Sequence, residues 1–198
     1  MMSRIKRKGT VIVLVVLLTC VFGITGAYGS QWPEKSFYGV GTYLPEPINY
    51  PNVKRQAYFG PNNYYYSPAG AYKARSVQSA TALFREGDYA LVDFYYPPMG
   101  KLCLYFQVDY LSTRNIAEES FISDPAYVTS EVQPMEGPGY DYHPLEETTK
   151  RGAVKQVYLS RGTRIDVLFE MNGWVFAEFS CSIGLIRAWI PSNMVASI

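Results

Sequence analysis

Two stretches of the chain alternate in side-chain character with a period of two. Between Tyr89 and Tyr96 the sequence reads Tyr-Ala-Leu-Val-Asp-Phe-Tyr-Tyr, and between Trp174 and Phe179 it reads Trp-Val-Phe-Ala-Glu-Phe. Successive side chains of a β-strand point to opposite faces, so this pattern predicts two strands that each turn one face to a core. The side chains expected in that core are Ala90, Val92, Phe94, Val175, Ala177 and Phe179.

Turn-forming residues precede both strands. Glu86 is followed by Gly-Asp and Met171 by Asn-Gly. Glycine and asparagine tolerate positive φ, so both places are expected to be hairpin turns. Further strands are expected at residues 101–106 and 164–169, and a single helical turn at 116–121. The sequence therefore predicts an all-β protein.

The two predicted hairpins belong to a longer internal repeat. Residues 84–94 align without a gap with 169–179, and after one added residue in the first copy 105–111 align with 189–195. Upstream, Gly-Pro-Asn-Asn-Tyr-Tyr-Tyr at 60–66 corresponds to Gly-Pro-Gly-Tyr-Asp-Tyr at 137–142. Three landmarks recur in one order, which predicts two copies of one small module.

The N-terminus has the order of a secretory signal. Four basic residues within the first ten are followed by an apolar run from Val11 to Phe22 and then by Ala27-Tyr-Gly, which resembles a cleavage site before Ser30. The apolar run is shorter than the roughly 20 residues that a spanning helix needs, so cleavage is favoured over an uncleaved membrane anchor. The protein is expected to be secreted or held at the cell surface.

Removal of the signal changes the charge balance. The full chain has 18 basic and 17 acidic residues, and loss of the four basic residues leaves 14 against 17. No basic patch remains to favour nucleic acid as a partner. A membrane is expected as a partner only through an uncleaved N-terminal segment.

The residues of the second copy suggest a family. Gly137-Pro138, Gly173-Trp174 and Trp189-Ile-Pro-Ser resemble the Gly-Pro turn, the Gly-Trp after a hairpin and the closing motif of bacterial SH3-like (SH3b) domains. The first copy is more divergent, with Asp88-Tyr89 in place of Gly-Trp. The resemblance covers roughly residues 54–198 and implies two tandem small SH3-like β-barrels.

The chain is divided accordingly. The expected parts are a signal peptide (1–29), an extended proline-rich arm (30–53), a divergent SH3-like module (54–112), a linker (113–126) and a second SH3-like module (127–198). The prolines of the arm disfavour a helix or a central strand.

Catalytic residues are sparse. A cysteine hydrolase needs a thiol and a histidine base, but the only histidine, His143, is expected in a surface turn. Cys103 is expected to be packed in a strand, and Cys181 lies in a polar turn; whether the two form one bridge stays open. No zinc-type spacing occurs, so neither a metal nor another cofactor is expected. The sequence predicts a non-enzyme.

Aromatic side chains are the remaining candidates for function. Exposed tyrosine and tryptophan rings can stack on a sugar or hold an extended peptide in a groove, although in so small a fold they can equally form the core. The candidate ligand-binding residues are Tyr64, Tyr66, Tyr89, Tyr105, Tyr140, Tyr142, Trp174 and Trp189.

The resemblance to SH3b domains gives these rings a partner. It implies a non-catalytic protein that binds cell-wall peptidoglycan or its peptides in aromatic grooves, with two weak sites reinforcing each other. The alternative is a structural or scaffolding protein that recognises another secreted protein. Grooves that are open to solvent favour the first function, whereas grooves filled by the arm or by the other module favour the second.

Overall fold

The computed structural model describes residues 30–45, 52–148 and 152–198. The predicted signal peptide and residues 46–51 of the predicted arm lie outside the described residues. Trp32–Ile198 forms one compact unit. In the described ranges, no helix is long and apolar enough to cross a membrane.

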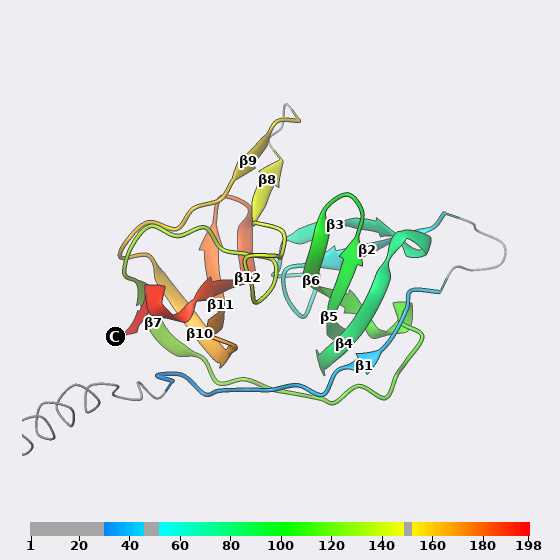
Figure 1. Ribbon diagram of the computed structural model, residues 1–198, viewed down its shortest axis with the longest axis horizontal. Coiled ribbons are helices and arrows are strands. Elements are labelled where there is room, and N and C mark those ends of the chain that lie inside the picture. Colours follow the sequence, from blue (N-terminus) through cyan, green and yellow to red (C-terminus); the bar gives the residue numbers. More distant parts are fainter. Residues whose placement is uncertain (1–29, 46–51, 149–151) are drawn as a thin grey trace, which may run out of the picture. The chain divides into compact units, whose positions relative to one another are not determined.

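The first half of the unit, residues 32–112, forms a six-stranded sheet in the order β1-β4-β5-β6-β2-β3 (Figure 1). Two short 3-10 helices, η1 and η2, follow β3 and β6. The elements are β1 (Val40–Gly41), β2 (Lys54–Tyr58), β3 (Pro68–Lys73), η1 (Ala74–Ser76), β4 (Gln78–Glu86), β5 (Tyr89–Tyr96), β6 (Gly100–Gln107) and η2 (Val108–Tyr110).

The second half, residues 116–198, forms a five-stranded sheet in the order β12-β11-β10-β7-β13 and a separate two-stranded hairpin, β8-β9. One 3-10 helix, η3, precedes the last strand. The elements are β7 (Asp124–Val128), β8 (Glu146–Thr148), β9 (Val154–Gln156), β10 (Arg164–Met171), β11 (Trp174–Cys181), β12 (Gly184–Pro191), η3 (Ser192–Met194) and β13 (Val195–Ser197).

The predicted all-β class is confirmed, but closed barrels are not. Among the described residues, each larger sheet runs from one edge strand to the other without returning to the first. The two predicted strands at residues 101–106 and 164–169 correspond to β6 and β10.

The sequence repeat is a structural repeat. The antiparallel series β4-β5-β6 followed by η2 corresponds to β10-β11-β12 followed by η3. Even the irregularities match, because the pairing register shifts between Ala82 and Phe84 in one half and between Val167 and Phe169 in the other. The predicted hairpin turns are also confirmed, with positive φ at Gly87, Asn172 and Gly173.

The repeat begins earlier than the sequence alignment indicated. Residues 32–37 (Trp-Pro-Glu-Lys-Ser-Phe) and 116–121 (Ile-Ala-Glu-Glu-Ser-Phe) lie 84 residues apart and share the glutamate, the serine and the phenylalanine. The two segments have the same sequence of buried and exposed positions. The expected helical turn at 116–121 is wrong, because the segment is extended and bridges to β4 through Glu118.

Candidate functional site: the face shared by the two halves

Both faces of the repeated strands are buried. The predicted core side chains, such as Val92 and Val175, are indeed in the main core. The opposite faces form a second cluster of buried residues that come from both halves: Phe84, Tyr89, Leu91, Cys103, Tyr105, Met135, Leu168, Phe169, Trp174, Phe176 and Trp189. Each aromatic face is therefore covered by the other half of the chain.

Ring contacts join the halves through this second cluster. The ring centroids of Phe84 and Phe169, which are equivalent positions, lie 6.0 Å apart in an edge-to-face arrangement. Tyr105 of β6 lies 6.4 Å from Phe176 of β11. Aromatic pairs at such separations add about 0.5–1.5 kcal/mol each beyond the burial of their area.

The predicted ligand-binding residues differ widely in exposure. Only Tyr64 and Tyr140 are largely exposed, at 89% and 78%. Tyr142 is half-buried. The others lie in the interior: Tyr66, Tyr89, Tyr105, Trp174 and Trp189. A ring with so little exposed surface offers no face to a ligand, so these five rings do not line an open groove.

The Gly-Pro motif positions one tyrosine of each half. A Cβ atom added to Gly60 would lie 2.1 Å from the ring of Tyr66, and one added to Gly137 would lie 1.8 Å from the ring of Tyr142. Each ring therefore lies directly against glycine backbone, which no other residue permits. This contact explains why glycine recurs at both places.

The two positioned tyrosines each bind a carboxylate of the other half. The hydroxyl of Tyr66 donates to Glu178 of β11, and the hydroxyl of Tyr142 donates to Asp93 of β5 over 2.9 Å. Glu178 and Asp93 are equivalent positions of the repeat. The contact between the halves is therefore reciprocal, as in a two-fold symmetric dimer.

Backbone hydrogen bonds follow the same reciprocity. On one side, the N–H of Arg187 donates to Phe59 (2.7 Å) and that of Ser67 to Leu185 (3.1 Å). On the other side, the N–H of Cys103 donates to Glu136 (2.5 Å) and that of His143 to Lys101 (2.8 Å). At these residues β12 and β6 each bond to the opposite half, whereas at Trp189 and Tyr105 they pair within their own half, with Met135 and Tyr58.

On one side of the contact, a buried arginine meets two carboxylates. Arg187 of the second half lies 2.7 Å from Glu86 of the first half and 2.9 Å from Glu178. Its guanidinium also lies 5.2 Å from the ring centre of Tyr66, and Tyr105 donates to Glu86 over 2.6 Å. The single guanidinium thus compensates two carboxylates only in part, at a place where water is largely excluded.

Cys103 occupies the position of Arg187 on the other side. Burial raises the pKa of its thiol well above the ordinary value, and the nearby Asp93 adds to this effect. Such a thiol resists forming the thiolate that a nucleophile requires. Cys103 and Cys181 are both free, so the bridge between modules that the sequence left open does not form.

The expectation that His143 lies in a surface turn is wrong. Its side chain is 16% exposed, with Nδ1 3.5 Å from Glu136 and Nε2 3.7 Å from Glu146. The contact with Glu136 raises the pKa of His143, against the opposing effect of burial. Burial in turn raises the pKa of Glu136. The pair of Glu136 and His143 could not be predicted from the sequence, because the two residues are seven positions apart and meet only across the Gly-Pro loop.

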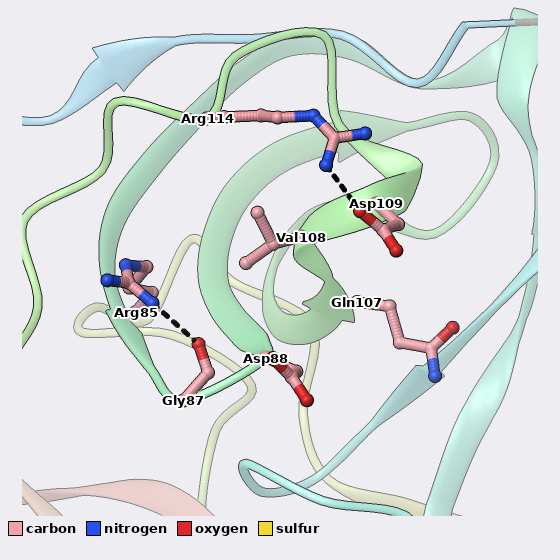
Figure 2. A pocket seen from close by; sticks show the side chains of 7 residues that line it. All are labelled: Arg85, Gly87, Asp88, Gln107, Val108, Asp109 and Arg114. Carbon is pink, nitrogen blue, oxygen red and sulfur yellow. Dashed lines mark hydrogen bonds and ion pairs between the residues drawn. The ribbon is translucent and has the colours of Figure 1, made fainter.

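A polar pocket lies where the β4-β5 turn meets η2 (Figure 2). Arg114 crosses it to Asp109 at 2.5 Å, and Arg85 donates to the carbonyl of Gly87 over 3.1 Å. Arg85 also pairs with Glu118 at 2.6 Å. No aromatic side chain lines the pocket, so it is not the ring-lined groove that the sequence predicted.

One exposed tyrosine of the second half lies against a tryptophan. The ring of Tyr140 stands edge-on to Trp174, with centroids 4.8 Å apart. The equivalent residue of the first half, Tyr64, is held in a turn in which its N–H donates to the side chain of Asn62 over 3.1 Å. Among the described residues, no three His, Cys, Asp or Glu side chains could together hold a metal ion.

Comparisons with known proteins add little to this geometry. No protein-family model matches the chain, and no curated protein does. The solved structure of NlpC2 from Trichomonas vaginalis is similar with a TM-score of 0.31 and 14% identity over 83% of this chain, and that of NlpC1 with 0.26 and 14% over 84%. The chain spans about half the length of either protein, 50% and 49%. At these TM-scores the likeness carries no conclusion about fold or activity.

Proposed function

We propose that the protein is a non-catalytic scaffolding protein that acts outside the cytoplasm, at the cell surface. Its two SH3-like halves recognise each other through their aromatic faces and present their outward loops to another secreted protein. The mutual burial of the two aromatic faces carries this proposal, because a filled groove cannot serve a free ligand. The charged N-terminal signal of the sequence supports the location.

The strand order supports the SH3-like description of each half. A three-stranded antiparallel series followed by a 3-10 helix occurs in both halves. In the second half, the closing strand β13 pairs with β7, the first strand of that half, which in turn pairs with β10. The Gly-Pro loop of each half reaches the opposite half through a tyrosine.

The partner is expected to contact the two equivalent exposed loop tyrosines, Tyr64 and Tyr140. A photoreactive phenylalanine analogue at either position in the producing cell should give the same discrete protein adduct. The matched control is Tyr158, which is 52% exposed but lies outside both Gly-Pro loops. Absence of an adduct at both loop positions, or equal labelling at Tyr158, would contradict the scaffolding function.

Binding of cell-wall peptidoglycan is the second candidate. The exposed ring of Tyr140 beside Trp174 favours it, because such a ring can stack on a sugar. Residues 30–198 would then be retained on purified sacculi, and the double variant Tyr64→Ala/Tyr140→Ala would not be retained. Retention of this kind without protein adducts would replace the first proposal by the second.

A further inference from the structure

The two repeated extended segments are exchanged between the halves. We call residues 32–37 the N-terminal arm and residues 116–121 the central arm. The N-terminal arm bonds to β10 of the second half, where Lys35 N–H donates to Glu170 (2.8 Å) and Glu170 N–H donates to Pro33 (2.9 Å). The central arm bonds to Arg85 of β4 in the same way, at 2.8 and 2.9 Å.

Side chains of both arms meet one another as well. The ammonium group of Lys35 lies 3.2 Å from the carboxylate of Glu119, its equivalent in the central arm. Phe37 lies 4.7 Å from Phe84 and 5.3 Å from Phe169, so the ring at the end of the N-terminal arm contacts both halves. Each half is therefore completed by the arm that leads into the other.

A short exposed connection joins the halves. It runs from Ser112 to Asn115, contains no helix or strand, and is largely exposed. Its polar contacts include the ion pair between Arg114 and Asp109, whose side chains are 68% and 77% exposed. Ion pairs of this exposure contribute about 0–1 kcal/mol. Ser112 is also hydrogen-bonded to Tyr43: its N–H donates to the Tyr43 carbonyl over 2.9 Å, and its hydroxyl oxygen accepts from the Tyr43 N–H over 3.0 Å. Both contacts are with residues of the first half, and neither joins the connection to the second half.

We propose that two copies of this chain exchange halves through the connection 112–115, so that the first half of one copy pairs with the second half of the other. Every arm, ring and backbone contact between the halves is then made again between chains, and only the connection changes course. Exchange of identical elements is a low-cost route to a dimer for this reason. Protein concentration then decides between the two forms.

The dimer would double the exposed loops. One particle would present two copies each of Tyr64 and Tyr140, so a polymeric or clustered partner would bind it more tightly than it binds the monomer. The inference rests on the contact between the halves and holds whichever ligand the loops bind.

Crosslinking distinguishes the two forms. In a Cys181→Ser background, the substitutions Lys35→Cys and Glu119→Cys place two thiols at the contact of the arms. A short bismaleimide can then join them. Residues 30–198 are refolded at low micromolar and at near-millimolar concentration, and the species are separated by mass. The expected result is a species of doubled mass at high concentration whose crosslink joins two chains, and a monomer crosslinked within itself.

A matched pair controls for chance encounters. Thr148→Cys and Val154→Cys lie opposite each other in the β8-β9 hairpin and should crosslink within one chain in both species. Deletion of Thr113 and Asn115 should convert the protein to the dimer, since the shortened connection no longer closes within one chain. A chain that stays monomeric at every concentration and after the deletion, or a dimer whose arms crosslink only within one chain, would overturn the proposal.

Discussion

The two halves share one backbone plan but meet each other with different side chains. At equivalent positions, β12 presents Arg187 where β6 presents Cys103, and the Gly-Pro loops end in Ser67 and His143. The backbone bonds and the glycine-tyrosine contacts are the same on both sides. The symmetry is thus carried by the backbone, whereas charge distinguishes one side of the contact from the other.

This difference favours the pairing of unlike halves. Arg187 comes from the second half, whereas Glu86, one of its two carboxylate partners, comes from the first. The position equivalent to Glu86 in the second half is Met171, so two second halves would bury Arg187 with one carboxylate fewer. Specificity often depends on such a penalty against the wrong pair.

Removal of the buried Arg187 cation should have the largest effect on the free energy of unfolding. In Arg187→Met, Glu86 and Glu178 lose their counter-charge while remaining 15% and 25% exposed. Breaking a buried ion pair costs about 3–5 kcal/mol, so the free energy of unfolding in urea should fall by that amount. The control Arg114→Met removes an exposed ion pair and should cost about 0–1 kcal/mol. Equal costs for the two variants would show that the buried cluster does not hold the halves together.

Substitution of the glycines in the two Gly-Pro loops tests the glycine-tyrosine contact that both halves share. Gly60→Ala and Gly137→Ala force each tyrosine ring away from the backbone, and overpacking of this kind costs about 1–3 kcal/mol. Gly41→Ala is the control, since a Cβ there meets nothing within 4 Å. In a Tyr142→Ala background, Gly137→Ala should lower the free energy of unfolding much less than it does in the wild type, because the two residues interact directly. Additive costs in urea unfolding would argue against the ring contact.

The repeated strands β4-β5-β6 and β10-β11-β12 could largely be predicted from the sequence. The burial of their second face between the two halves could not. Alternation between Tyr89 and Tyr96 identifies a strand and one buried face. It does not reveal that Tyr89 and Leu91 on the opposite face are buried too, because an apolar side chain looks the same in a core and in a contact between halves. For the same reason Tyr105 and Trp189 were expected to bind a ligand.

The positions of the N-terminal and central arms could not be predicted, for a different physical reason. An extended segment that bonds to a strand only near one residue has neither helical nor strand periodicity. The only signal in the sequence is that Ser36-Phe37 and Ser120-Phe121 are the same dipeptide. The described part of residues 30–53 carries the short strand β1. The position of the arm on β10 depends on a contact across the whole chain, which no local pattern encodes.

The pH dependence of stability should show the smallest effect. It concerns only one side of the contact, because only that side carries His143. Its pKa is raised by Glu136, with Glu146 also facing the ring, so the folded state holds the proton more tightly than the unfolded state does. The stabilisation is complete below the ordinary histidine pKa and is lost as the pH rises through the raised value. The free energy of unfolding should therefore decline as the pH rises above the ordinary histidine pKa of about 6.5. His143→Gln should flatten this decline, whereas Ser67→Ala, at the equivalent place, should leave it intact. A decline that survives in His143→Gln would assign the pH dependence to other groups and leave the two sides of the contact alike in their response to protons.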